Sequence, residues 1–453
     1  MKTLYSALLC VLLTAVSYAQ KETEKDTLNK KTTKLNEVIV TGNKNTDPVL
    51  TIVSNKYVEN IVQPKNVADL FNNIIGFSSI KRGNYAIDPS FRASQYEQLN
   101  IQYDGGTKAM HACPNRMDPI TTHIIPEEIS KIEIIKGPYT VRYGATFGGV
   151  INMVTEKPNY LDYGLHGKIS GGYESNGNSF VNMAQLQYIQ EKYDIVANAG
   201  YRDFGNYEDG DGTEIPSSFR STDYGVKVGY NFTENQRLQA HWRQSFGRDV
   251  LHAALPMDTD YDNSSIISLD YKLDNIGKVI KSVNAKAYYS YVDHLMTNTN
   301  RPSFNMMEAA SNVDATTTGG KVELHWQPAK SLNIFSGIDM LNVARDGSRE
   351  RLVKVMNGNL LPQPMLFTDK VWQDSYINDL GVFTEAKYSV IPNTILTAGI
   401  RYDNVVSDIK DPEADFEAMY DLEKRTEHNI SATVSVKKIV SDNFTLEAAY
   451  GRG

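Results

Sequence analysis

Residues 129–158 read ISKIEIIKGPYTVRYGATFGGVINMVTEKP. Apolar and polar residues alternate over positions 129–135, which predicts a β-strand, and Lys136-Gly137-Pro138 then signals a tight turn. Residues 150–154 predict a further strand that stops at Lys157-Pro158. Three glycines between the two strands let the backbone bend and pack closely in a narrow space: Gly144, Gly148 and Gly149.

This stretch closes a region, residues 48–160, that we expect to form one compact α+β domain. Residues 66–74 have helical spacing and precede Gly76. Residues 99–103 alternate and run into Asp104-Gly105-Gly106, a strong turn signal. Short helical and strand signals in close succession predict a mixed domain.

Beyond Tyr160 the sequence changes to short alternating segments with aromatic residues at their ends, for example 193–201 and 396–402. Segments of about 9–11 residues suffice for tilted membrane strands, and aromatic ends are typical of interfacial girdles. Short connections such as 233–235 alternate with long polar ones, which are 203–220, 297–318 and 403–428. We therefore predict an all-β transmembrane β-barrel over residues 161–453, with a soluble β-sandwich as the alternative. The mean hydropathy of −0.40 is blind to such strands, because lipid-facing and lumen-facing residues cancel.

The N-terminus predicts an exported protein. Lys2, the apolar residues 8–16 and Ser17-Tyr18-Ala19 have the pattern of a cleavable signal peptide over residues 1–19. Residues 20–47 are expected to be a flexible segment, since positions 20–34 are charged and lack an apolar period. Residues 35–42, LNEVIVTG, are a β-prone island within it. They would form either an ordinary first strand or a detachable strand that pairs with the sheet edge of a partner.

The number of strand signals is small for the size of the N-terminal domain. About a dozen strands are expected before Gly453, whereas a lumen that holds a domain of this size needs a barrel of about 22 strands. The sequence also ends without the terminal aromatic strand residue expected of such barrels. We therefore expect the 453 residues to be the N-terminal portion of a longer protein.

Residues 129–158 closely resemble the plug-domain signature of TonB-dependent outer-membrane receptors. This resemblance implies that residues 48–160 fill the lumen of the barrel and that the protein lies in the outer membrane of a Gram-negative bacterium. Residues 35–42 are similar to the energising box of that family, the TonB box. The resemblance implies TonB and outer-membrane lipid as partners of a monomer, with TonB bound by Leu35, Glu37, Val38, Ile39, Val40 and Thr41.

Two short motifs carry ligands for a soft metal ion. Cys10 lies in the signal peptide, so Cys113 is the single thiol of the mature chain and cannot form an internal disulfide. Cys113 and Met117 would stack on one side of a helical turn begun by Pro114, or would share the apex of a loop. His294 and Met296 are two apart on a predicted strand, so both side chains leave the same face. Thiolate and thioether ligands favour Cu(I), while the imidazole keeps Cu(II) and Zn(II) open.

The two motifs, CxxxM at 113–117 and HxM at 294–296, resemble the copper-binding motifs of TonB-dependent copper receptors. The resemblance implies that copper is the transported ligand and is held by Cys113, Met117, His294 and Met296. Met110 and His111 precede the cysteine and are additional or alternative ligands. We expect Cu(I) to be favoured, Cu(II) to be open as well, and no organic cofactor.

Other interpretations compete with copper uptake. The same fold could carry a siderophore, cobalamin or another metal chelate, or serve as a surface adhesin or a receptor for phage and colicins. The net charge of −8 argues against nucleic acid. We expect no enzyme, because HExxH, Walker-type and nucleophile-elbow motifs are absent. The remaining histidines are interpreted as ordinary side chains without a metal role: His123, His166, His241, His252, His325 and His428. Four methionines are expected in outward loops, where they could collect metal: Met306, Met307, Met356 and Met365. The role of Met257 is left open.

Overall fold

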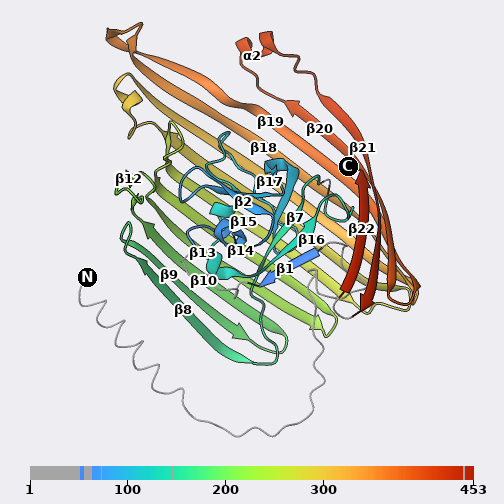
Figure 1. The fold of residues 1–453 in the computed structure, drawn as a ribbon. Coiled ribbons are helices and arrows are strands. Elements are labelled where there is room, and N and C mark those ends of the chain that lie inside the picture. The colour runs from blue at the N-terminus through green and yellow to red at the C-terminus, as the bar shows by residue number, and fades with distance from the viewer. Residues whose placement is uncertain (1–50, 56–63, 73, 145, 442–443, 453) are drawn as a thin grey trace, which may run out of the picture. The chain divides into compact units, whose positions relative to one another are not determined.

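The computed structural model describes residues 51–55, 64–72, 74–144, 146–441 and 444–452 (Figure 1). The predicted signal peptide 1–19 and the segment 20–47 with its TonB box lie outside these residues. Within the described residues, no helix has the length and apolar character needed to cross a membrane.

One antiparallel sheet of 13 strands dominates the described part of the chain. Its strand order runs from β22 at one edge to β8 at the other, and strands that follow one another in the list below are hydrogen-bonded neighbours. The strands are β8 (Gly164–Glu174), β9 (Ser179–Ile189), β10 (Tyr193–Phe204), β13 (Phe219–Thr233), β14 (Gln236–Val250), β15 (Asp258–Asp274), β16 (Ile280–Thr297), β17 (Met307–Ala329), β18 (Leu332–Met356), β19 (Asn359–Ile391), β20 (Thr394–Ile409), β21 (Arg425–Ser441) and β22 (Phe444–Arg452). A minor hairpin, β11 (Tyr207–Glu208) with β12 (Glu214–Ile215), lies between β10 and β13. The predicted barrel strands are confirmed.

Side chains of the sheet alternate between a buried face and an exposed face. On β16, the residues Ser290, Val292 and Met296 are buried, whereas Tyr289 and Tyr291 are exposed. This period of two is what places one set of side chains toward the lumen and the other toward lipid. His294 and Met296 therefore both belong to the inner face.

The N-terminal domain contains short strands and single-turn 3-10 helices. Its main sheet has the order β1-β6-β7-β5, with β5 parallel to β7, and a second sheet joins β2, β3 and β4. The strands are β1 (Thr51–Asn55), β2 (Phe77–Lys81), β3 (Ile87–Phe91), β4 (Ser94–Gln95), β5 (Leu99–Tyr103), β6 (Ile129–Lys136) and β7 (Gly149–Thr155). Its 3-10 helices are η1 (Val67–Phe71), η2 (Tyr96–Gln98), η3 (Ile120–Thr122) and η4 (Pro126–Glu128). Two further helices lie in connections of the large sheet: the 3-10 helix η5 (Pro302–Asn305) and the α-helix α2 (Ala414–Met419).

The helical signal over residues 66–74 yields only the short 3-10 helix η1. Asn66 caps its start by accepting a hydrogen bond from the Ala68 amide. Gly76 has a φ of 97° and leads directly into β2, so the chain turns away before a second helical turn can form. The apolar spacing instead supplies the domain core, in which Val67, Leu70 and Phe71 are buried.

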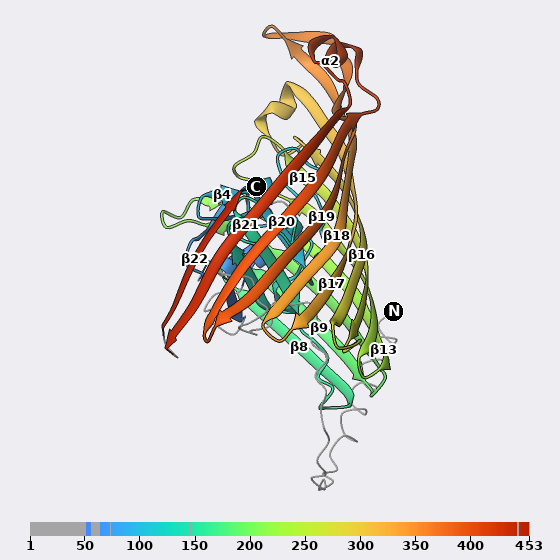
Figure 2. The same ribbon diagram turned by 90° about the vertical axis from the view of Figure 1, so that its right-hand side faces the viewer.

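All three long connections predicted as loops are partly strand. The connection 203–220 contains β11, β12 and the ends of β10 and β13. β17 begins at Met307, inside the expected loop 297–318, and β20 and β21 extend into the expected loop 403–428. Likewise, Met307, Met356 and Met365 lie on strands, with Met307 opposite Val353 and Val353 opposite Met365. Polar composition misled the prediction, because strands that extend past a membrane still satisfy their backbone hydrogen bonds by pairing. Figure 2 shows this extension of β18 and β19 at the top.

The N-terminal domain packs against the inner face of the sheet through buried polar contacts (Figure 1, Figure 2). Glu128 accepts from Arg243 of β14 at 2.6 Å, and Asp104 pairs with Lys227 of β13 at 2.7 Å. Thr140 donates to Glu385 of β19 at 2.7 Å. These contacts reach strands far apart in the sheet, so they fix the position of the domain.

The close approach of β7 to β6 at Gly149 requires a residue without a side chain. Gly149 has a φ of +131°, and a Cβ atom there would collide with the carbonyl oxygen of Ile135. We predict that Gly149→Ala lowers the free energy of unfolding by about 1–3 kcal/mol, the range for overpacking a filled interior. Protease protection of the N-terminal domain, measured against temperature, reports this loss.

Gly164→Ala is the matched control for that prediction. Gly164 has a similar φ of +124°, but no atom lies within 4 Å of the added Cβ. The control carries the backbone strain alone, so it should be the more stable variant. Equal stability of the two variants would contradict the steric argument.

Candidate metal-binding site

Cys113 lies in a tight turn that the N-terminal domain holds against the sheet. The Arg116 amide donates to the Cys113 carbonyl at 2.8 Å, and Arg116 has a left-handed φ of 55°. The chain therefore forms a turn at the apex of a loop, not the helical turn that Pro114 favours. The Arg116 guanidinium pairs with Asp88 at 3.1 Å and so anchors the turn to β3.

Asp118 fixes the backbone on both sides of the cysteine. Its carboxylate accepts hydrogen bonds from the amides of Ala112 and Cys113, the latter at 3.1 Å. The Ala112 carbonyl in turn accepts from the indole Nε1 of Trp372 at 2.6 Å. The loop is thus held from within by Asp118 and from β19 by Trp372.

The sheet supplies the other two predicted ligands from β16. His294 and Met296 are both buried and lie opposite Asp262 and Thr259 of β15. The connection 275–279 joins the other ends of β15 and β16, so the two residues lie near the sheet end with the longer connections. Directly opposed residues share a face, and Asp262 and Thr259 therefore face the N-terminal domain together with His294 and Met296.

The structure brings the four predicted ligands together. The Cys113 Sγ atom lies 3.7 Å from the Met296 Sδ atom. The Thr259 hydroxyl lies 3.4 Å from His294 Nε2 and 3.7 Å from Met117 Sδ. Cys113, Met117 and His294 are each 0% exposed, so the four side chains form one buried cluster.

Apolar side chains surround the sulfur atoms. Val292, Val313 and Ala315 of the sheet pack against the cysteine and the two methionines, together with the partly buried residues Leu255, Met257, Val371 and Trp372. Met257, whose role was left open, thus contacts the cluster. Such surroundings exclude water from the ligands.

Met110 and His111 have other neighbours. Burial, with Arg116 and Arg345 nearby, lowers the pKa of His111 to about 2. The ring is therefore neutral at pH 7, and its Nδ1 atom lies 3.0 Å from Arg116 Nη1. Met110 lines a cavity with Lys108, Tyr288 and Asp339. The structure therefore gives these two predicted additional ligands contacts outside the sulfur cluster.

Polar residues next to His294 were missed by the sequence prediction. His123 and His252, interpreted as ordinary side chains, are 0% exposed, and His252 Nε2 lies 3.0 Å from the Thr259 hydroxyl. Asp262 accepts a hydrogen bond from Tyr85 at 2.8 Å and lies 3.8 Å from His123 Nδ1. Nothing in the spacing of these residues indicated the cluster, because strand pairing and the packing of the N-terminal domain against the sheet bring them together.

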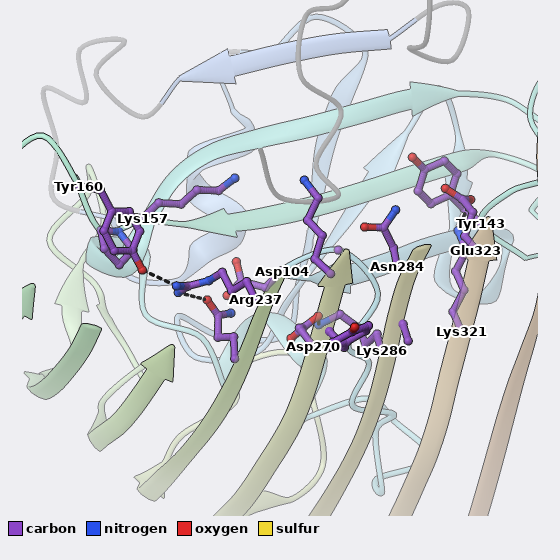
Figure 3. A pocket seen from close by; sticks show the side chains of 16 residues that line it. Asp104, Tyr143, Lys157, Tyr160, Arg237, Asp270, Asn284, Lys286, Lys321 and Glu323 are labelled. Atoms are coloured by element: carbon purple, nitrogen blue, oxygen red, sulfur yellow. Dashed lines mark hydrogen bonds and ion pairs between the residues drawn. The ribbon is translucent and has the colours of Figure 1, made fainter. Parts of the chain in front are cut away.

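A second cavity lies toward the end of the sheet with the short connections (Figure 3). Its lining includes residues from the starts of β14 and β16 and from the N-terminal domain. Arg237 of β14 donates hydrogen bonds to Tyr160 of the N-terminal domain and to Gln239 of β14. It shares Tyr143, Lys286 and Lys321 with the cavity that contains Met110. The two cavities therefore adjoin along one side of the domain.

Family models match both parts of the chain. The TonB-dependent receptor plug domain matches residues 43–150, and the TonB-dependent receptor-like β-barrel matches residues 206–453. The chain belongs to the TonB-dependent receptors. The receptor is accordingly an outer-membrane protein of a Gram-negative bacterium, in which the N-terminal domain is the plug and the 13-stranded sheet belongs to the barrel wall.

Individual relatives of the receptor differ in what their names say they carry. The hemin receptor of Yersinia enterocolitica is 23% identical over 70% of this chain and 47% of its own length. The rhizobactin receptor of Rhizobium meliloti is 23% identical over 51% of this chain and 33% of its own. This receptor thus spans about half or less of the length of these relatives.

Among solved structures, the copper transporter OprC has a TM-score of 0.74 and 24% identity, covering 89% of this chain and 63% of its own. The ferric citrate transporter FecA has a TM-score of 0.69 and 14% identity, covering 88% and 62%. At these identities the likeness concerns the fold alone.

The role of Asp118 in holding the loop can be measured through the thiol. We predict that Asp118→Ala raises the rate of Cys113 alkylation at least about tenfold, because two backbone amides lose their acceptor and the loop opens. Asp118→Asn retains an acceptor oxygen and should change the rate far less. Equal rates in the alanine variant and the unmodified receptor would show that the loop does not depend on this carboxylate.

Proposed function

We propose that this receptor binds copper between plug and barrel and carries it into the periplasm. The single observation that carries the proposal is the 3.7 Å separation of Cys113 Sγ and Met296 Sδ inside a fully buried cluster. Two sulfur atoms bonded to one tetrahedral metal at about 2.3 Å would lie about 3.8 Å apart. The spacing therefore fits shared ligation without a rearrangement of the backbone.

The chemistry of the ligand set favours copper over other metals. A thiolate and two thioethers select Cu(I), whereas Mg²⁺, Ca²⁺ and Mn²⁺ prefer oxygen ligands. His294 would complete the set through Nε2, the ring nitrogen that lies 3.4 Å from the Thr259 hydroxyl, which also contacts Met117 Sδ. In the proposed mechanism the side chains only bind and release the metal ion, and no covalent bond is made or broken. We therefore infer that the receptor is not an enzyme.

Transport would require movement of the plug. The outer membrane holds no ion gradient, so the energy would come from TonB, pulling on residues 35–42. The buried contacts between plug and barrel, such as Glu128 with Arg243, would have to break or shift during this step. The adjoining cavities beside Tyr143 and Lys286 offer a route toward the periplasm once the plug moves.

A metal chelate is the second candidate cargo. The names of two relatives, a hemin receptor and a rhizobactin receptor, favour it. The buried sulfur cluster does not require a chelator, because the four side chains can satisfy a bare ion by themselves. Direct copper binding by the purified receptor therefore separates the two candidates.

The copper proposal predicts a loss of Cu(I) affinity when a ligand is removed. Met296→Leu retains volume but removes the thioether, and Cys113→Ser removes the thiolate. Each should weaken Cu(I) binding at least about tenfold, equivalent to about 1.4 kcal/mol or more. Competition with a chromophoric Cu(I) chelator measures the affinity.

Met183→Leu is the control, because Met183 is a buried wall residue of β9 outside the cluster. Its affinity should equal that of the unmodified receptor. Unchanged Cu(I) binding in both ligand variants would exclude these residues from the site.

The transport proposal predicts that binding and uptake can be separated. Deletion of residues 35–42 should abolish copper uptake by cells, because the link to TonB is lost. The purified deletion variant should bind Cu(I) as tightly as the unmodified receptor, since the site lies elsewhere. Uptake that persists at the original rate would contradict TonB-driven transport, and surface adhesion should be unaffected in either case.

A further inference from the structure

Two buried carboxylates lie beside the His294 ring. One ligand atom from each of Asp118, Asp262 and His294 falls within 4.8 Å of the other two. All three residues are 0% exposed. This group is distinct in chemistry from the sulfur cluster, although it shares the imidazole.

Two atoms of this group face each other without a hydrogen bond. His294 Nδ1 and Asp262 Oδ1 form a buried ion pair at 3.4 Å, but neither atom has a hydrogen-bond partner. The other carboxylate oxygen of Asp262 already accepts from the Tyr85 hydroxyl. A buried polar atom without a hydrogen bond is costly, and a cation bound by both atoms would remove that cost.

The backbone fixes all three groups in place. Asp262 and His294 are directly opposed in the pairing of β15 with β16, so they point to the same face. Asp118 is held by the amides of Ala112 and Cys113 on the plug loop. The site is therefore built from both plug and barrel, as the sulfur cluster is.

We propose that Asp118, Asp262 and the Nδ1 atom of His294 form a second subsite, which takes Cu(II). This inference rests on the proposed copper function and extends it to the divalent ion. Carboxylate and imidazole ligands favour Cu(II) and Zn(II) over Cu(I). In the tetragonal geometry of Cu(II), adjacent ligand atoms bonded at about 2.0 Å lie about 2.8 Å apart. His294 Nδ1 and Asp262 Oδ1 are 3.4 Å apart, so the two side chains would move together slightly on binding.

Sharing one imidazole makes the two subsites exclusive. A neutral imidazole has a lone pair on only one nitrogen, and the other nitrogen carries the proton. Cu(I) held at Nε2 therefore requires a proton on Nδ1, and Cu(II) held at Nδ1 requires a proton on Nε2. The oxidation state of the arriving ion decides which side of the ring is used, without any electron transfer in the receptor.

The test uses Cu(II) titration and electron paramagnetic resonance on the purified full chain in detergent. It is carried out in the Cys113→Ser background, so that Cu(II) does not oxidise the thiol. Adding Asp262→Asn should weaken Cu(II) binding at least about tenfold and change the resonance spectrum. Adding Asp293→Asn is the control, since Asp293 is next to His294 but on the opposite face, and it should change neither.

Cu(I) affinity, measured with Cys113 intact, separates this inference from the proposed function. Asp262→Asn should alter Cu(I) binding much less than Cu(II) binding. Unchanged Cu(II) affinity, or equal losses for both ions, would overturn the second subsite. A failure of the proposed sulfur site would be seen in a different measurement, as an unchanged Cu(I) affinity of the Met296→Leu variant.

A structural measurement covers the case in which Asp262→Asn does not fold. Crystals of the unmodified receptor soaked in Zn(II) should give anomalous density bonded to Asp262 and to Nδ1 of His294. Density only at Cys113 and Met296, or an adventitious ion only, would overturn the proposal.

Discussion

Charged contacts between plug and wall determine where every functional side chain lies. Arg243 with Glu128 and Lys227 with Asp104 are buried pairs that join the plug to adjacent strands. Removing one member of such a pair costs about 3–5 kcal/mol, because the other charge stays buried without compensation. These contacts define one seated position of the plug, and in that position the Cys113 loop faces β16.

The alternation of the sheet then determines which residues of β16 face that loop. A slip of one residue in the pairing of β15 with β16 would turn His294 and Met296 toward lipid and bring Leu295 inward. The register is specified by burial along the whole strand, since Ser290 and Val292 share the inner face with the two ligands. The site is thus a product of long-range strand pairing and plug seating together.

This dependence explains what could be predicted from sequence. The strands of the wall and the turn at Gly137-Pro138 follow from local patterns. The four proposed sulfur and imidazole ligands could also be selected from sequence, because their spacings are local. Asp262 and Tyr85 are far from His294 in sequence and follow no motif, so only strand register and plug packing bring them to it. The loop predictions failed for a related reason: composition reports polarity, whereas pairing with a neighbour decides whether a polar segment is a strand.

Burial of Cys113 also has a consequence for the lifetime of the receptor. Disulfide exchange requires a thiolate to reach an attacking or receiving sulfur along an open path. Cys113 is 0% exposed, and Met296, Val292 and the loop hydrogen bond from Trp372 close the space around it. In a compartment where exposed thiols are oxidised, this enclosure keeps the sulfur reduced and shields it from covalent capture by other exported proteins.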